Sequence, residues 1–246
     1  MKKQNYIFDL YGTLCDIHTN ESKANLWKKM AEIYGSYGAC YDWRDLKKSY
    51  GKLCSEESAL LEKKMGKFAE IELRTVFQRL FENKGIVVDE SLVDYVAVTF
   101  RVLSRSVLYV YMGIWDLLDE IHDKGGKNYL LSNAQNVFTI PELKMLGLYD
   151  KLDGIYISSD KRMKKPDPRF LEGLLEEYGL KKEESIMIGN DRTTDIVIAN
   201  SCGIDSLYIH SNNSYTNLKK AASKNQEATY EVLDGNIYRV KDILLK

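Results

Sequence analysis

The sequence predicts an α/β fold, with a mainly parallel, doubly wound sheet and an inserted block of four helices. Two observations predict the sheet: short apolar runs recur along the chain, and helical patterns separate them. A third predicts the insertion, because residues 20–107 carry apolar positions spaced by three and four with almost no strand pattern. We therefore expect a core domain of residues 1–16 and 108–246, and a helical cap domain of residues 17–107.

Six apolar runs are the expected strands. The first, Tyr6 to Phe8, ends on Asp9 and breaks at once into a turn that contains Gly12. The others are residues 129–131, 155–157, 186–188, 207–209 and, with a weaker pattern, 230–233. Short runs that are apolar throughout and separated by helices are typical of parallel strands covered on both faces.

The helices of the inserted block are expected from their apolar spacing. The first ends at Gly35, the second begins at Asp42 as a plausible N-cap, and the third stops near Gly85. The marker residues are Leu26, Trp27, Met30, Ala31 and Tyr34, then Ile71, Leu73, Val76, Phe77, Leu80 and Phe81, then Leu92, Val93, Tyr95, Val96 and Phe100. Four helices in succession predict a small bundle.

Composition and charge argue against several functional classes. Lys plus Arg is 35 against 36 for Asp plus Glu, so the net charge of -1 favours neither nucleic acid nor an anionic membrane as a partner. No run of about 18 apolar residues predicts a membrane span, and the apolar run before Asp9 is too short for a signal peptide. The four cysteines form no CxxC pair and the three histidines are scattered, which predicts reduced thiols in a cytoplasmic protein rather than a zinc site.

Polar residues follow several of the expected strands. Asp9 follows the first strand, Ser132 and Asn133 follow the run that ends at Leu131, and Asp191 comes shortly after Ile188. Because the carboxyl ends of neighbouring parallel strands line one crevice, we expect these side chains to converge there. A carboxylate presented at such a strand end is a candidate nucleophile.

The chain contains four motifs in this order: Asp9-Leu10-Tyr11-Gly12-Thr13-Leu14, Leu131-Ser132-Asn133, Lys165-Pro166-Asp167-Pro168, and Gly189-Asn190-Asp191 through Asp195. Together they resemble the motifs of the haloacid dehalogenase-like hydrolase superfamily. The resemblance implies a Rossmann-like core with a helical cap. It also implies a hydrolase in which Asp9 attacks the substrate and forms a covalent aspartyl intermediate that water later cleaves.

The resemblance also assigns roles to residues of the second and third motifs. Thr13 and Ser132 would offer hydroxyl groups, and Lys165 a cation, to the oxygens on which charge develops. Lys164 is chemically identical, but the family motif places its lysine directly before Pro-Asp-Pro, which favours Lys165. The candidate substrate contacts in these motifs are Ser132, Asn133, Lys165 and Tyr11.

The last motif predicts a Mg²⁺ site. Asp191 and Asp195 lie four residues apart, which would place both carboxylates on one face at the start of a helix. Together with Asp9 and the backbone carbonyl of Tyr11 they form a small set of hard oxygen ligands, which Mg²⁺ prefers. We expect Asp191 to bind the metal directly and Asp195 to act through water or a neighbour. The metal would neutralise Asp9 against an incoming phosphate dianion.

Tyr11 leaves the reaction type open. In the phosphatase branch of the family an Asp usually stands here and protonates the leaving group, whereas a phenol with a pKa of about 10 is a poor replacement. The dehalogenase branch carries Tyr here, since a halide departs without a proton. The lead interpretation is a Mg²⁺-dependent phosphatase of a small phosphorylated metabolite. The alternatives are 2-haloacid dehalogenase-type hydrolysis of a carbon–halogen bond through an aspartyl ester, and a binding or regulatory protein of low activity.

The cap is expected to select the substrate, because it closes over core residues that contact only the transferred group. Arg44 lies near the loop between the first two cap helices, beside Trp43, and is a candidate substrate contact. Aromatic packing with an exposed arginine explains the same residues equally well. The chain is expected to act as a monomer or a homodimer.

Overall fold

A six-stranded parallel sheet forms the centre of the core. The computed structural model describes residues 3–214 and 220–245. The strand order is β5-β4-β1-β6-β7-β8, and every pairing is parallel. The strands are β1 (Asn5–Phe8), β4 (Lys127–Ser132), β5 (Gly154–Ile157), β6 (Ser185–Gly189), β7 (Asp205–Ile209) and β8 (Tyr230–Val232). The predicted α/β class is confirmed, and each of the six apolar runs overlaps one of these strands.

Helices cover both faces of this sheet. Successive residues of a strand point to opposite faces, so Phe8 packs with one set of helices and Ile7 with the other. The Phe8 face is covered by α5 (Ile114–Asp123), α6 (Asn136–Met145) and α10 (Ile237–Leu245). The Ile7 face is covered by α8 (Pro168–Glu177) and α9 (Val197–Cys202). Shorter helical segments lie at α7 (Ser158–Lys161), η1 (Tyr149–Lys151), η2 (Lys182–Glu184) and η5 (Lys224–Gln226).

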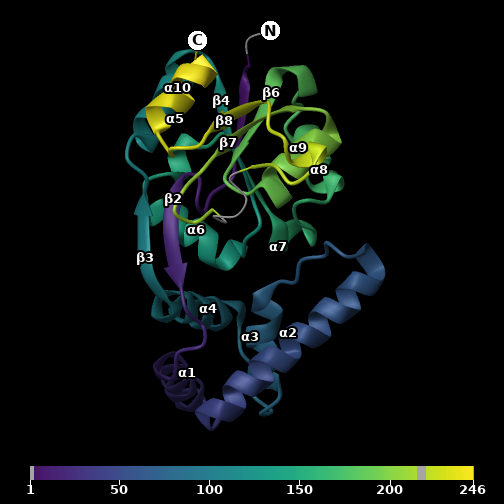
Figure 1. Cartoon of the computed structure of the whole chain (residues 1–246). Helices are drawn as coiled ribbons and strands as arrows, with labels where there is room; N and C mark the ends of the chain where they lie inside the picture. The colour runs from purple at the N-terminus through teal and green to yellow at the C-terminus, as the bar shows by residue number, and fades with distance from the viewer. Residues whose placement is uncertain (1–2, 215–219, 246) are drawn as a thin grey trace.

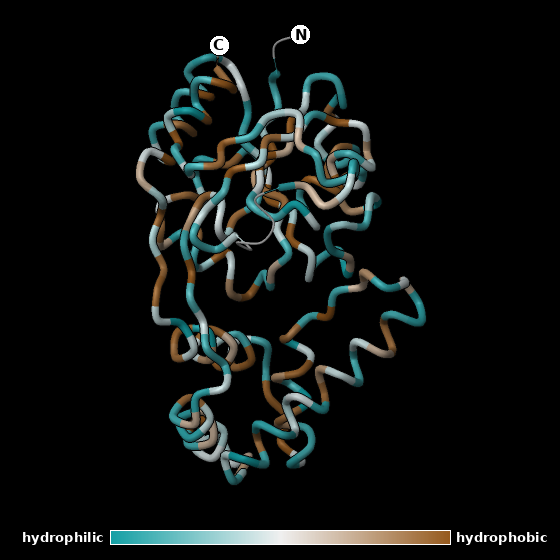
Figure 2. Tube along the Cα trace, in the orientation of Figure 1, coloured by the Kyte–Doolittle hydropathy of each residue, from teal (hydrophilic) through white to brown (hydrophobic). Residues whose placement is uncertain are grey.

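Four helices form the inserted group, which lies on the opposite side of the core from both termini (Figure 1). They are α1 (Ala24–Ser36), α2 (Trp43–Met65), α3 (Leu73–Glu82) and α4 (Glu90–Ser104). Asp42 caps α2 as expected, because its Oδ1 accepts a hydrogen bond from Arg44 N at 2.8 Å. The group packs around a core rich in aromatic rings, which include Trp27, Tyr34, Tyr50, Phe77, Phe81 and Phe100. The C-terminal half of α2 is largely hydrophilic, whereas the hydrophobic segments lie where helices pack on one another and on the sheet (Figure 2).

An antiparallel ribbon that the sequence did not predict joins the core to the helical group. It pairs β2 (Cys15–Thr19) with β3 (Arg105–Val110), and Figure 1 shows it running between the two parts. Both expected domain boundaries, after residue 16 and after residue 107, fall inside this ribbon. The division into a core and a cap domain remains a prediction. Among the described residues, no helix is long and apolar enough to cross a bilayer.

A second connection between the helical group and the core is made by residues 68–73, between α2 and α3. Ala69 forms an antiparallel bridge with Met163, and Lys164 N donates to Phe68 O at 3.0 Å. Gln135, from the loop after β4, binds the same segment with its side-chain amide. Its Nε2 donates to Ile71 O at 2.8 Å, and its Oε1 accepts from Leu73 N at 2.8 Å.

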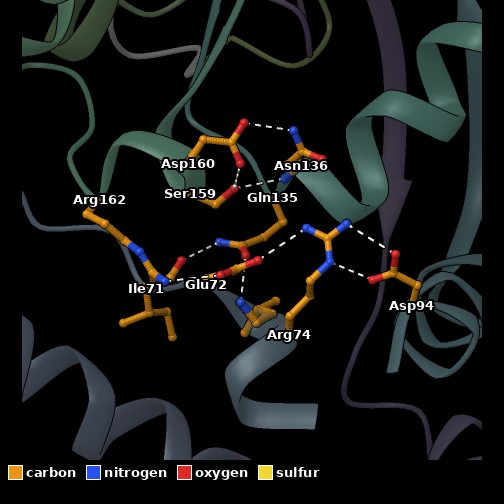
Figure 3. A network of polar contacts seen from close by, with 10 residues as sticks. Ile71, Glu72, Arg74, Asp94, Gln135, Asn136, Ser159, Asp160 and Arg162 are labelled. Carbon is orange, nitrogen blue, oxygen red and sulfur yellow. Dashed lines mark hydrogen bonds and ion pairs between the residues drawn. The ribbon is translucent and has the colours of Figure 1, made fainter. Parts of the chain in front are cut away.

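Charged side chains extend this contact (Figure 3). Glu72 pairs with Arg162 of the core at 3.0 Å and with Arg74 of α3 at 3.2 Å. Arg74 in turn pairs with Asp94 of α4 at 2.5 Å. Partly exposed pairs of this kind contribute little to stability individually, so we attribute most of the specificity of this contact to the Gln135 amide.

We expect Gln135→Ala to loosen the helical group from the core without unfolding either part. The change removes two hydrogen bonds to backbone groups, which is a loss of about 1–3 kcal/mol at this contact. Amide hydrogen exchange at residues 69–73 should therefore accelerate. Gln78→Ala is the matched control, because among residues 3–214 and 220–245 the exposed Gln78 amide bonds Glu82 and no other residue. Equal exchange in the two variants would contradict this role for Gln135.

Candidate functional site

A buried lysine joins two carboxylates at the carboxyl ends of the central strands. Lys165 Nζ lies 2.6 Å from Asp9 Oδ1, at the end of β1, and 2.7 Å from Asp195 Oδ1, just beyond β6. It also donates to Leu131 O of β4 at 2.9 Å. All three charged residues are buried. Burying these charges is tolerable because each carboxylate faces the ammonium group.

The protonation of this group follows from its contacts. Burial lowers the pKa of the Lys165 ammonium, but Asp195 and Asp9 outweigh it and raise the pKa above its usual value. Burial raises the pKa of the Asp195 carboxyl to about 7, with Lys165 opposing and Asp9 adding to the shift. Lys165 is therefore a permanent cation beside Asp9.

Asn133 fixes the backbone of Lys165. Its Oδ1 accepts from Lys165 N at 2.8 Å, and its Nδ2 donates to Lys165 O at 3.0 Å. The sequence suggested Asn133 as a substrate contact, but the structure uses its amide to position the lysine. Lys164 points elsewhere, since its Nζ lies 3.5 Å from Glu70 of the helical group. The structure thus brings Lys165 rather than Lys164 to Asp9.

Two hydroxyl groups lie beside this centre. Thr13 Oγ1 is 3.4 Å from Asp9 Oδ2 and 3.3 Å from Asn190 Oδ1, which are long hydrogen bonds. Ser132 Oγ is buried at the end of β4 and has no hydrogen-bond partner among the described residues. A buried hydroxyl without a partner is uncommon and needs an explanation. An oxygen of a bound substrate would supply the missing partner.

The two acids of the last motif have different surroundings. Asp191 Oδ1 accepts from Thr193 N and from Thr193 Oγ1, both at 2.7 Å, and so caps the π-helical turn η3 (Arg192–Ile196). Asp195 Oδ2 accepts from Asp191 N at 2.9 Å, while its Oδ1 faces Lys165. Asp195 also packs against Gly189, where a Cβ atom would lie 2.2 Å from Asp195 Oδ2.

Asn190 is a residue of this site to which the sequence analysis gave no role. Its amide packs over Gly12, where a Cβ atom would lie 2.3 Å from Asn190 Nδ2, and Gly12 has a φ of 90°. Only glycine fits this position without strain. Asn190 stands inside the quoted fourth motif, so its place beside the Asp191 carboxylate was the available signal.

The Tyr11 hydroxyl is directed to α6. The Tyr11 OH donates to Glu142 Oε2 at 2.5 Å and lies 3.3 Å from Thr139 Oγ1, both on α6. Burial, with Glu142 next in importance, raises the pKa of Tyr11 far above its usual value. Tyr11 therefore stays protonated and cannot act as a general base at neutral pH.

Arg44 is not brought to this group. It lies at the start of α2, and the connection between α1 and α2 is at the end of the helical group farthest from the core (Figure 1). Its guanidinium carbon is 4.4 Å from the centre of the Trp43 ring, and the residue is exposed. This placement matches the packing explanation of the Trp43-Arg44 pair.

The donor atoms near Asp9 suit Mg²⁺ in kind. Carboxylate and backbone carbonyl oxygens are the hard ligands that this ion prefers, and it commonly uses only one or two protein carboxylates. The described residues contain no group of three His, Cys, Asp or Glu side chains that could hold a metal by themselves. Both oxygens of Asp195 already face Lys165 or Asp191 N, whereas Asp191 has committed Oδ1 to Thr193. The residues thus fit a Mg²⁺ ion that is bound by few side chains.

The fold and this strand-end site define a class of enzyme, the hydrolases built on a parallel α/β core. A family model described as haloacid dehalogenase-like hydrolase matches residues 42–209, and the chain belongs to that family. The matched region covers the motifs of Ser132, Lys165 and Asp191. It begins after the first motif, so the assignment does not depend on Asp9 or Tyr11.

Characterised relatives are similar over varying lengths. The chain is 28% identical over 137 residues to the pyrimidine 5'-nucleotidase PynA of Streptococcus pneumoniae, a match that covers 55% of this chain and 56% of that protein. It is 25% identical over 213 residues to the pyrophosphatase PpaX of Halalkalibacterium halodurans, which covers 85% of this chain and 84% of that protein.

Solved structures share the whole fold at low identity. A 2-haloacid dehalogenase from Pseudomonas syringae matches with a TM-score of 0.64 and 18% identity, covering 99% of this chain and 98% of that one. A HAD phosphatase from Thermococcus onnurineus matches with a TM-score of 0.60 and 18% identity, covering 100% of this chain and 98% of that one. At this identity the likeness establishes the fold, which a dehalogenase and a phosphatase share.

Proposed function

We propose that this hydrolase is a Mg²⁺-dependent phosphatase of a small phosphorylated metabolite. The observation that carries the proposal is the Asp9–Lys165 pair with the unpartnered Ser132 hydroxyl beside it, at the ends of β1 and β4. A carboxylate nucleophile, a fixed cation and a free donor are the groups that phosphoryl transfer needs. The names of the two relatives, a nucleotidase and a pyrophosphatase, support the same substrate class.

Asp9 would attack phosphorus and form an acyl phosphate. The bond from phosphorus to the leaving oxygen breaks, and that oxygen departs with its electron pair. Water then attacks the phosphorus of the aspartyl phosphate, which releases phosphate and restores the Asp9 carboxylate. Ser132 and Thr13 would donate hydrogen bonds to the phosphoryl oxygens, while Lys165 holds Asp9 in place and offsets the growing charge.

In this proposal Mg²⁺ is held by Asp9, the backbone carbonyl of Tyr11 and Asp191, with Asp195 acting through its neighbours. Both Asp195 oxygens already have partners, since Oδ1 faces Lys165 and Oδ2 accepts from Asp191 N. This supports Asp191, rather than Asp195, as the direct ligand. When bound, the ion supplies positive charge that offsets repulsion between Asp9 and a phosphate dianion. Among the described residues, Lys165 is the one cation that pairs with Asp9 and Asp195, so two carboxylates share one positive charge and a second cation would be stabilised there.

The fixed Tyr11 hydroxyl predicts a preference for acidic leaving groups. Because no acid replaces the usual Asp at residue 11, a leaving alkoxide would depart without a proton, which costs on the order of 10²- to 10⁴-fold in rate. For a series of aryl and alkyl phosphates, kcat/KM should fall steeply as the pKa of the leaving alcohol rises. A flat dependence would show that another group donates the proton.

Carbon–halogen hydrolysis is the second candidate function, and Tyr11 is the observation that favours it. A halide needs no proton, so a Tyr11 hydroxyl engaged by Glu142 costs that reaction nothing. Release of p-nitrophenol from its phosphate, with Mg²⁺ and with a chelator, should be compared with halide release from 2-chloropropionate. Metal-dependent phosphate release supports the phosphatase. Halide release that a chelator leaves unchanged supports the dehalogenase, and the absence of both activities would favour a binding role.

A further inference from the structure

One buried carboxylate outside the proposed chemistry binds three residues from two separate segments of the chain. Glu142 lies on α6 and is only 3% exposed. Its Oε1 accepts from Arg101 Nε at 2.8 Å and from Arg105 Nη1 at 2.7 Å. Its Oε2 accepts from Arg101 Nη2 at 3.2 Å and from Tyr11 OH at 2.5 Å.

Two of the donors lie where the chain returns from the helical group to the core, and the third lies in the loop that follows Asp9. Arg101 is in the last turn of α4, and Arg105 is the first residue of β3, so together they mark the place where the chain returns from the helical group. Tyr11 belongs to the loop that follows Asp9. The Arg101 guanidinium also lies 5.4 Å from the centre of the Tyr11 ring, which adds a second contact between the same two segments.

A buried carboxylate couples its partners energetically. Taking such a charge out of water is costly, and the cost is offset only while its donors stay in place. If Tyr11 moves, Glu142 loses one hydrogen-bond donor, and its hydrogen bonds to Arg101 and Arg105 change in geometry. If α4 moves with the helical group, the arginines withdraw and the Tyr11 hydroxyl loses the charge that orients it. The position of the return segment therefore bears on the loop that carries Asp9.

We propose that Glu142 is a positioning residue, which transmits the placement of α4 and β3 to the nucleophile loop through Arg101, Arg105 and Tyr11. It touches neither Asp9 nor Lys165 among the described contacts, so its effect is exerted through Tyr11. This role gives the tyrosine at residue 11 a function that is independent of the reaction type. It applies equally to a phosphatase and to a dehalogenase.

Tyr11→Phe tests the coupling, because it removes one hydroxyl and keeps the ring. We expect amide hydrogen exchange to accelerate about tenfold in residues 101–110, which are remote in sequence, as well as in residues 10–15; this is the size of effect for a hydrogen bond to a charged group. Tyr238→Phe, which changes an exposed tyrosine of α10, should leave both segments unchanged. The measurement needs no substrate, so it stands or falls separately from the proposed function. Faster exchange confined to residues 10–15 would overturn the proposal.

A double-mutant cycle gives the second test. Glu142→Gln keeps the shape of the side chain and removes its charge, and on the proposal its effect on exchange at residues 101–110 already includes the loss of the Tyr11 contact. The Tyr11→Phe/Glu142→Gln pair should then exchange about as fast as Glu142→Gln alone. Effects that multiply would show independent roles and overturn the proposal. If Glu142→Gln does not fold, the Tyr11→Phe measurement decides the proposal by itself, with the two outcomes given above.

Discussion

Asp9→Asn is expected to abolish turnover, with a loss of at least about 10⁴-fold in kcat. An amide has no charged oxygen with which to attack phosphorus or carbon, so the covalent intermediate cannot form. In the parent chain Lys165 Nζ donates to Asp9 Oδ1 at 2.6 Å. The substitution keeps the size of the side chain and one oxygen that can still accept this hydrogen bond. The fold should therefore survive, and the thermal midpoint should change little. Rapid quenching followed by peptide mass measurement should find the modified residue 9 only in the parent chain.

Asp119→Asn is a suitable control for this change. Asp119 is an exposed acid of α5 that pairs with Lys151, and it has no described contact with Asp9, Lys165 or Asp195. Its variant should turn over substrate at the parent rate. If Asp9→Asn kept a tenth or more of the parent activity, the nucleophile would have to be another group.

Lys165→Met should give the second-largest effect, because it removes the cation from between two buried carboxylates. Charge stabilisation of this kind is typically worth 10² to 10³ in kcat, so a loss of about that size is expected. Breaking a buried ion pair also costs about 3–5 kcal/mol of folding free energy. Without the ammonium group, the already raised pKa of Asp195, about 7, should rise further and leave that carboxyl protonated at neutral pH. Initial rates and urea unfolding curves measure the two losses.

The neighbouring lysine supplies the matched control for this experiment. Lys164→Met removes the same charge one residue earlier, where Nζ is partly exposed and faces Glu70 at 3.5 Å. It should lower kcat by no more than a few-fold and leave the unfolding curve almost unchanged, since pairs of that kind contribute about 0–1 kcal/mol. Equal losses in the two variants would show that Lys165 has no special role.

The sheet was readable from the sequence because its strands are apolar on both faces. Runs such as Ile186 to Ile188 need no partner information to be recognised as buried strands. The β2–β3 ribbon was not readable, since its burial falls from the core end outwards and it pairs residues about 90 positions apart, such as Ile17 with Leu108. Pairing over that distance is determined by where the helical group begins and ends, and no local pattern encodes it.

The sequence was sufficient to predict which motifs form the site, but not how their side chains are oriented. The sequence suggested that Asp9, Ser132 and Lys165 would meet; the structure pairs Lys165 with Asp9 and places Ser132 at the end of β4, the strand beside β1. It did not indicate that the amide of Asn133 would bind backbone, or that Asp191 would cap a turn. Glu142 gave no signal at all, because an acidic side chain in a helix is usually exposed to solvent. The hydrogen-bond partners of these side chains depend on which donors and acceptors the fold brings within about 3 Å, and the sequence does not encode that locally.

The β2–β3 ribbon has a mechanical consequence for how the helical group can move. The chain leaves the core in one strand and returns in the other, and five pairs of residues join the two side by side. A two-stranded ribbon resists stretching and shear along its length, but it bends easily across its face. We therefore expect the helical group to rotate about a single axis, set by bending of the ribbon, rather than to move freely in all directions relative to the core.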